Sequence, residues 1–215
     1  DATTLRTRLF VNGQINDDWS YTGMLQNEQK FDDNEGNDGT DLKRAYLNGK
    51  LGGLAVTAGR WDEAPYSGNV ADLTGDGIKV SYGEKVKVWG AALKANEATE
   101  NGTSADRVYL AGVNTTIGVV DAYAMYAKGT GKAAGDDNKE IYNVGASLDV
   151  AKDLNLAYEY MWGDKAYNEK VSKDGWVATL SYKGADAAAP GSWGLSAMYY
   201  DQPVNAFINP TTDAD

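Results

Sequence analysis

The sequence predicts an all-β fold, an antiparallel up-and-down transmembrane β-barrel, and three observations lead to that fold class. Apolar and polar residues alternate with a period of two along one segment after another, which is typical of strands with one apolar and one polar face. The connections between these segments are alternately short and long. Most tryptophans lie beside the connections, where a membrane barrel places its aromatic residues.

The hairpin 140–162 shows the alternation most clearly. On its first strand Val144 and Leu148 share an apolar face, whereas Asn143 and Ser147 share the polar face. After a tight turn the same pattern resumes on the second strand. The apolar face runs for about ten residues per strand, which is the length that a tilted strand needs to cross a bilayer.

The same pattern predicts twelve strands in all, and no segment shows a convincing helical period. The predicted strands cover residues 5–15, 19–30, 42–51, 54–61, 77–82, 85–94, 107–115, 119–127, 140–150, 154–162, 175–183 and 193–200. Regular alternation of short turns and long loops is typical of outer-membrane barrels, whereas a soluble sandwich mixes its loop lengths.

The direction of the end strands predicts that the barrel is incomplete. The first strand descends from the long-loop side and the last strand climbs back to it, whereas single-chain bacterial barrels have an even strand number and both termini on the periplasmic side. We therefore expect residues 1–215 to form one partial outer-membrane barrel domain, a fragment of a barrel of about 14 to 16 strands. No signal peptide begins at Asp1, so we expect a mature chain or an excised segment.

The composition excludes several function classes. The chain carries 20 basic and 31 acidic residues, a net charge of −11, and it has no basic stripe of the kind that nucleic-acid binding requires. It contains no cysteine and no histidine, which removes disulfides, thiolate nucleophiles, Ser-His centres and most zinc sites. We predict no enzymatic activity, no cofactor and no metal site.

Tryptophans beside the connections are expected to form two interfacial girdles. These girdle candidates are Trp19 and Trp193 beside short connections, and Trp61, Trp162 and Trp176 beside long ones. Ordinary tryptophans of a soluble β protein are the alternative interpretation.

Charged residues on the polar faces are the candidate pore lining. Arg6, Arg8 and Arg44 share the polar face by parity, which in a barrel points to the water-filled lumen, whereas the face of Arg60 also holds apolar residues and is ambiguous. The arginines would form a basic wall at a constriction or would simply solvate the lumen. Further lining candidates are Lys79 and Glu159; a catalytic role for Glu159 is disfavoured because no nucleophile or base accompanies it.

The connection 62–75 is the long loop least suited to open water, because it is rich in apolar residues and carries only three acidic ones. We expect it to bend into the lumen. Its acidic residues, Asp62, Glu63 or Asp72, would then lie opposite Arg6, Arg8 and Arg44 across a water-filled gap and orient polar solutes. The loop 31–41 is the most acidic, with five carboxylates; divalent-cation bridging to anionic lipids and simple solvation both remain open.

Five segments carry a resemblance to a known family. They are residues 5–13 (Leu-Arg-Thr-Arg-Leu-Phe-Val-Asn-Gly), 42–47 (Leu-Lys-Arg-Ala-Tyr-Leu), 59–61 (Gly-Arg-Trp), 148–160 (Leu-Asp-Val-Ala-Lys-Asp-Leu-Asn-Leu-Ala-Tyr-Glu-Tyr) and 191–200 (Gly-Ser-Trp-Gly-Leu-Ser-Ala-Met-Tyr-Tyr). In these segments the chain resembles the outer-membrane porins of two-membraned Firmicutes, the Negativicutes, which carry an N-terminal S-layer-homology domain.

The resemblance implies a homotrimeric porin in the bacterial outer membrane, with its long loops facing outside. Such a porin allows passive diffusion of small hydrophilic solutes and ions, and it is attached to peptidoglycan through a domain that this chain does not contain. The alternative function is that of a structural outer-membrane protein that tethers the membrane to peptidoglycan, or of a surface adhesin.

Overall fold

The computed structural model describes residues 3–31, 39–96, 105–131, 138–164 and 170–211. They form one antiparallel sheet of twelve strands in sequence order, which confirms the predicted fold class. The strands are β1 (Thr4–Gln14), β2 (Trp19–Lys30), β3 (Gly39–Leu51), β4 (Leu54–Glu63), β5 (Leu73–Tyr82), β6 (Val86–Ala95), β7 (Arg107–Ile117), β8 (Val120–Thr130), β9 (Lys139–Ala151), β10 (Leu154–Gly163), β11 (Asp174–Lys183) and β12 (Gly194–Asp201).

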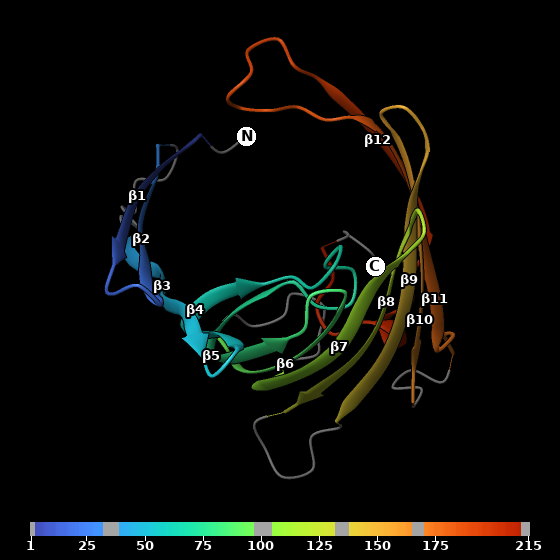
Figure 1. Ribbon diagram of the computed structural model, residues 1–215, viewed down its shortest axis with the longest axis horizontal. Helices are drawn as coiled ribbons and strands as arrows, with labels where there is room; N and C mark the ends of the chain where they lie inside the picture. The colour runs from blue at the N-terminus through green and yellow to red at the C-terminus, as the bar shows by residue number, and fades with distance from the viewer. Residues whose placement is uncertain (1–2, 32–38, 97–104, 132–137, 165–169, 212–215) are drawn as a thin grey trace.

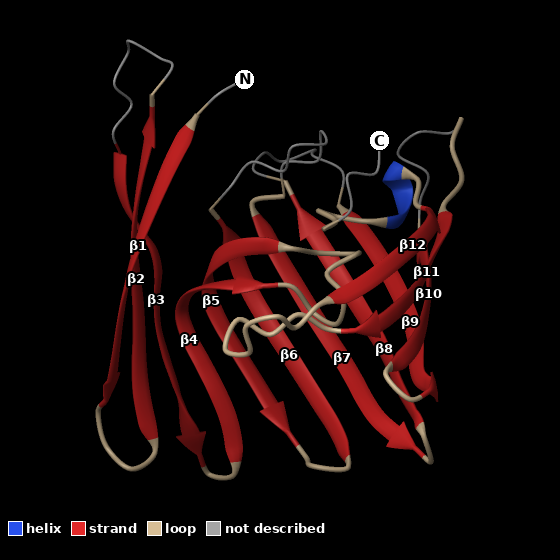
Figure 2. Ribbon diagram, turned by 90° about the horizontal axis from the view of Figure 1, so that it is seen from above, coloured by secondary structure: helices blue, strands red, loops and turns tan. Residues whose placement is uncertain are grey.

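A 3₁₀ turn, η1 (Val204–Ala206), follows the last strand. Within the described ranges no helix is long and apolar enough to span a membrane. The short turns between β1 and β2, β3 and β4, β5 and β6, β7 and β8, and β9 and β10 lie together at one end of the sheet (Figure 2). The turn between β3 and β4 uses Gly52 and Gly53, which have φ values of 56° and 84°; tight hairpin turns require such positive φ values.

The sheet curls into an open, C-shaped wall (Figure 1). Its two edges are β1, which pairs with β2, and β12, which pairs with β11; among the described residues these two edges do not pair with each other. Along one side of β1 and one side of β12, the backbone N–H and C=O groups therefore have no neighbouring strand among the described residues.

Two strands begin three or more residues earlier than the sequence pattern predicts. The third strand starts at Gly39 rather than 42, and the fifth starts at Leu73 rather than 77. Glycine and aspartate weaken the strand signal in both places, but residues 73–77 are paired in register with β4, and from Gly75 onwards with β6 as well. The fourth strand also extends to Glu63, so the connection is residues 64–72 and not 62–75.

The wall divides between β3 and β4 near the long-loop end. These strands pair only as far as Ala45↔Arg60; beyond that point β3 stays beside β2, and β4 stays beside β5. The upper end of the β4–β5 hairpin bends into the curve of the sheet (Figures 1 and 2). This inward bend places the connection 64–72 inside the wall.

A cross-strand pair of glycines marks the point of division. Gly59 has a φ of 125°, and a Cβ there would lie 2.3 Å from the carbonyl oxygen of Ala45. Its partner in the register is Gly77, where a Cβ would lie 2.0 Å from the carbonyl oxygen of Ala92. Only glycine fits these two backbone positions without rearrangement.

The buried apolar cluster lies on the concave face, where residues 64–72 and the segment 202–211 cover strands β6 to β11. Its members from the wall include Leu93, Val108, Leu110, Met125, Ile141, Met161 and Val177. Its members from the two covering segments include Val70, Ala71, Ala206 and Ile208. The concave side of strands β6 to β11 is therefore covered by packed side chains rather than open.

Candidate pore lining and constriction

The two faces of the wall have opposite character. Large apolar side chains lie exposed on the convex face, among them Leu9 (59% exposed), Leu156 (39%) and Leu195 (68%). Where the buried apolar cluster does not cover it, the concave face instead carries charged and amide side chains from the same strands, such as Arg8 and Asn155. An apolar outside around a polar inside is the arrangement that a barrel needs when lipid surrounds it.

Aromatic side chains cluster on the convex face of β8 to β12. Trp162 stacks on Tyr142 with ring centroids 5.6 Å apart, and Trp176 lies 5.3 Å from Tyr199. Trp193 lies near the short-turn end and contacts Tyr182 at 5.7 Å. At that same end, the ring of Trp19 covers Gly49 of β3. Girdle positions remain a prediction for these four tryptophans.

Trp61 does not lie on the outer face, and here the structure corrects the sequence interpretation. Its side chain is only 6% exposed and belongs to the buried cluster inside the wall. The indole N–H donates to the carboxylate of Glu63, two positions along the same face, at 2.8 Å. The inward bend of the β4–β5 hairpin carries Trp61 away from any lipid-facing position.

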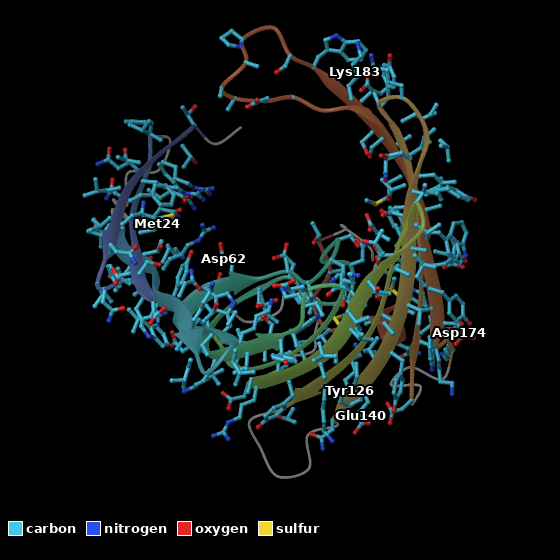
Figure 3. The ribbon with its side chains drawn as sticks, viewed as in Figure 1. Met24, Asp62, Tyr126, Glu140, Asp174 and Lys183 are labelled. Carbon is cyan, nitrogen blue, oxygen red and sulfur yellow. The ribbon has the colours of Figure 1, made fainter. Side chains whose placement is uncertain are left out.

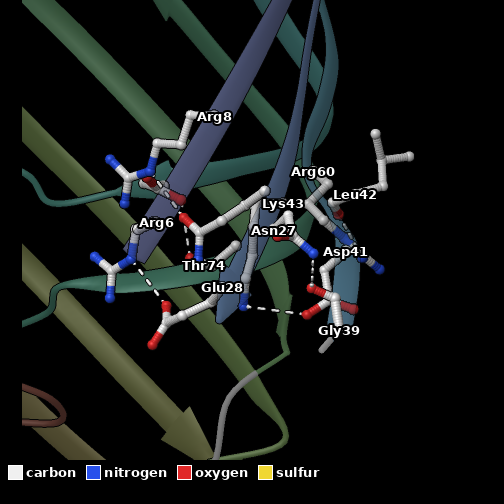
Figure 4. A network of polar contacts seen from close by, with 12 residues as sticks. Arg6, Arg8, Asn27, Glu28, Gly39, Asp41, Leu42, Lys43, Arg60 and Thr74 are labelled. Carbon is white, nitrogen blue, oxygen red and sulfur yellow. Dashed lines mark hydrogen bonds and ion pairs between the residues drawn. The ribbon is translucent and has the colours of Figure 1, made fainter. Parts of the chain in front are cut away.

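The arginines of β1 pair with the neighbouring strand (Figure 4). Arg6 Nε donates to the carboxylate of Glu28 at 2.8 Å, and Arg8 Nε donates to the side-chain carbonyl of Gln26 at 2.8 Å. Both partners lie on β2 at the register positions directly opposite. Arg6 is therefore neutralised within the wall, whereas Arg8 keeps an unbalanced positive charge.

The remaining two candidate arginines bridge the division between β3 and β4. Arg44 of β3 forms an ion pair with Asp62 of β4, and the carboxylate of Asp62 also accepts from the Thr74 hydroxyl at 2.8 Å. Arg60 forms a two-point ion pair with Asp76 at 2.8 and 2.9 Å and donates to a backbone carbonyl of β3 at 3.2 Å. Asp62 lies on the inner side of the wall (Figure 3).

These contacts correct the predicted arrangement of opposed charges. Asp62 and Arg44 touch, and neither faces the other across a gap. Glu63 pairs with Lys79 at 2.6 Å. Asp72 accepts from the hydroxyl of Thr211 at 3.1 Å. The prediction was wrong in this respect because two of the three acidic residues belong to strand β4, where cross-strand partners are within reach.

A hollow of about 570 Å³ is lined by β3 to β6, where the β4–β5 hairpin bends inward. Its charged lining residues are Arg44, Asp62, Glu63, Lys79 and Lys87. Lys79 also lies over the ring of Trp89, with its Nζ 4.7 Å from the centroid. Because three cationic side chains and only two carboxylates are among these lining residues, the hollow keeps an excess of one positive charge.

The connection 64–72 crosses the concave face and contacts strands far away in the sequence. Tyr66 stacks on Tyr123 of β8 with ring centroids 3.6 Å apart, and its hydroxyl accepts from the Trp89 indole at 3.1 Å. The same hydroxyl donates to the carbonyl of Val113 at 3.3 Å. Burial raises the pKa of the Tyr66 phenol, so the hydroxyl keeps the proton that it donates.

Glu159 faces the connection from β10. Its side chain is 7% exposed, and it accepts from the side-chain amide of Asn69 at 3.0 Å. Glu159 therefore lies beneath the inward connection, where it fastens the connection to the wall rather than lining open water. The sequence pattern placed it correctly on the inner face but could not show what covers it.

Two acidic residues of the opposite wall complete the charge distribution. Asp121 of β8 and Asp149 of β9 lie on the concave face and line separate hollows. Parity along the strands would have identified Asp121, which the pore-lining candidates did not include. The concave face of β1 to β6 thus carries arginines and lysines beside the carboxylates of Glu28, Asp62 and Glu63, and that of β8 to β10 carries carboxylates together with Lys139. No group of three or more acidic, histidine or cysteine side chains suited to a metal ion occurs in the described ranges.

Most of the acidic loop residues lie outside the described residues. This applies to residues 32–38 of the most acidic loop, and also to residues 97–104, 132–137 and 165–169. Divalent-cation bridging by these loops therefore stays a prediction.

Comparison with known proteins was made by sequence and by structure. No family model and no curated protein matches the sequence. Similar solved structures include a Rhodopseudomonas blastica porin triple mutant, with a TM-score of 0.57 and 16% identity over 93% of this chain and 75% of that one. Pseudomonas aeruginosa OccD3 gives 0.57 and 11%, covering 100% and 63%, and the outer membrane channel DcaP of Acinetobacter baumannii gives 0.51 and 15%, covering 91% and 66%. The chain therefore has the fold of outer-membrane porins and channels.

Proposed function

We propose that this chain is the wall of a bacterial outer-membrane channel that lets small hydrophilic solutes and ions diffuse passively. The observation that supports this proposal most directly is the contrast between the faces, apolar and exposed outside, charged and polar on the uncovered part of the inside. A soluble protein rarely leaves so much apolar surface in water, whereas lipid around a water-filled lumen requires it.

In this proposal the conducting path follows the inner face of β1 to β5. The other half of the concave face is covered by residues 64–72 and 202–211, which pack against β6 to β11. The uncovered half carries Arg8 and the hollow beside Lys79 and Lys87. Solutes would pass between this basic wall and the inward connection, and the local excess of positive charge would favour anions.

Several narrower features belong to the proposal. The protein would lie in the bacterial outer membrane as a homotrimer, with its long connections outside. Membership of the Negativicutes porins with an S-layer-homology domain, and attachment to peptidoglycan through such a domain, stay predictions of the sequence resemblance. We propose no enzymatic role, because the inner carboxylates Glu159 and Asp149 are each bonded to an asparagine amide.

Conductance in a planar lipid bilayer tests the proposed function. The native protein, extracted from the cell envelope in detergent, should give stepwise increases in current when it is added to the bilayer. A protein that only tethers the membrane or adheres to surfaces would give no steps, and it would instead bind isolated peptidoglycan or a surface ligand. Absence of steps from protein that still inserts into vesicles would overturn the channel proposal.

A further inference from the structure

The segment 202–211 lies directly against the inward connection on the concave face. Four backbone hydrogen bonds of 2.6 to 3.2 Å join the two segments. The bonds run from Asp72 to Asn209, from Ile208 and Asn209 to Val70, and from Thr211 to Gly68. Ala71 and Asn209 form a parallel β-bridge. Two stretches separated by more than 130 positions therefore form one unit.

The same segment is seated in the wall by buried apolar side chains. Ala206, Phe207 and Ile208 are at most 1% exposed. The wall has glycine where the segment comes closest: a Cβ on Gly175 of β11 would lie 3.1 Å from Pro203 and 3.3 Å from Ala206. A side chain at Gly175 would therefore push the segment away from the wall.

Polar side chains fasten the segment at three further points. Lys139 of β9 donates to the carbonyl of Val204 at 2.5 Å, and its Nζ lies 5.3 Å from the ring centroid of Phe207. The Asn205 amide donates to two carbonyls of the β10–β11 connection at 3.1 Å. The Gln202 amide donates to the backbone carbonyl of Asn69.

The connection 64–72 has little internal support of its own. Among the described residues, one backbone hydrogen bond lies within it and closes a turn from Gly68 to Pro65 at 3.0 Å. Tyr66 has a φ of 58° and Gly68 a φ of 75°, and a left-handed conformation at a tyrosine persists only when its surroundings hold it. A Cβ at Gly68 would lie 2.2 Å from the hydroxyl of Thr211, so the turn is shaped to fit the segment.

We propose that residues 202–211 are the positioning element of the constriction: they hold the connection 64–72 inside the lumen and thereby set the width of the conducting path. Ile208 and Asn209 are the positioning residues, since they supply the backbone bonds and the buried anchor. This inference rests on the proposed channel function. It predicts that loosening residues 202–211 frees the connection 64–72 and widens the conducting path, while the strands of the wall stay unchanged.

A disulfide tests whether the two segments stay together in the membrane. The chain contains no cysteine, so the pair Ala71→Cys and Asn209→Cys can form only the intended bond, and bridge partners lie within the reach of a disulfide. We expect near-complete cross-linking in vesicles. The control pair, Ala189→Cys and Asn209→Cys, joins opposite ends of the wall and should not cross-link. Failure of the first pair to cross-link would overturn the docking, whether or not the protein conducts.

Loosening the segment tests its effect on the path. Ile208→Asn places an amide within the buried apolar cluster. We expect a higher single-channel conductance together with faster protease cleavage within 64–72. Val204→Asn makes the same change at a half-buried position of the same segment and should leave conductance near the wild-type value. Adding the 71–209 disulfide to Ile208→Asn should restore the wild-type conductance.

These outcomes separate the inference from the channel proposal. An Ile208→Asn variant that conducts as the wild type does while its connection becomes cleavable would overturn the positioning role and leave the channel intact. If the Ala71→Cys and Asn209→Cys protein cross-links but neither it nor the wild type ever conducts, the channel is overturned instead. Should Ile208→Asn fail to fold, Thr211→Ala removes a surface contact of the same unit and is assayed in the same way.

Discussion

Asn69 and Glu159 stand ninety positions apart and meet inside the wall, where the amide of Asn69 donates to the carboxylate of Glu159 at 3.0 Å. Both side chains are almost fully buried, at 2% and 7% exposure. This contact fastens the inward connection to β10. Because a buried polar group that loses its partner is costly, the pair makes a direct prediction.

Glu159→Ala should destabilise the folded protein by about 1 to 3 kcal/mol, because it leaves the buried amide of Asn69 without this acceptor. The measurement is urea unfolding in lipid vesicles, followed by tryptophan fluorescence. Asp149→Ala is the matched control, since Asp149 accepts its hydrogen bond from Asn155 at an exposed site. Equal losses for the two variants would show that the connection is not fastened at Glu159.

The assigned faces can be tested on one hairpin. Leu156 is exposed on the convex face of β10, whereas Ser147 lines a hollow on the concave face of β9. Leu156→Lys should cost about 2 to 4 kcal/mol of barrel stability, because lysine would face the middle of the bilayer, and Ser147→Lys should cost little. Similar penalties at both positions, measured in the same vesicles, would contradict the faces.

The glycine pair at the division of the wall should not tolerate side chains. Gly59→Ala introduces a Cβ at a φ of 125° and 2.3 Å from a backbone oxygen, and we expect a loss of about 1 to 3 kcal/mol. Gly13→Ala is the control, because nothing lies within 4 Å of a Cβ there. A Gly59→Ala protein as stable as the Gly13→Ala protein would mean that the inward bend does not depend on this backbone conformation.

The strands could be predicted from the sequence because residues alternate along them between the convex and the concave face, with register shifts only in the β2–β3 and β9–β10 pairs of the described residues. The boundaries of β3 and β5 were missed, since Gly39 and Gly75 weaken the strand pattern while backbone pairing with neighbours decides the outcome. Cross-strand pairing is a property of two segments together, so a pattern within one segment cannot show it.

The site was predictable only in part. The apolar content of 62–75 correctly indicated that this connection turns inward, but the division between β3 and β4, which brings Arg44 to Asp62, has no local signal. Trp61 was wrongly predicted to be a girdle residue, because a tryptophan beside a loop can lie either in a girdle or in a buried cluster. The segment 202–211 was overlooked, although Phe207 and Ile208, which follow the last predicted strand, carry the same apolar signal as Tyr66 and Val70.

The edges β1 and β12 support a prediction about residues 1–215 on their own. An open sheet in lipid leaves unpaired backbone groups at both edges, which is unfavourable where water is absent. Expressed alone, the segment should aggregate or pair edge to edge. A monodisperse species whose electrophoretic mobility changes on heating, as folded barrels show, would contradict the expectation that this is a fragment of a larger barrel.

The most direct test of the proposed path is the ion selectivity of the native protein carrying Arg8→Ala together with Arg44→Ala. Removing two positive charges from the wall, and releasing Asp62 from its ion pair, should raise conductance and shift the reversal potential towards cation selectivity. The shift should be largest at low salt, because charges are screened beyond about 8 Å at physiological ionic strength. Arg107→Ala, at a 64% exposed side chain, should change the reversal potential less. A double variant with an unchanged reversal potential in a planar bilayer would place the constriction elsewhere and contradict the path along β1 to β5.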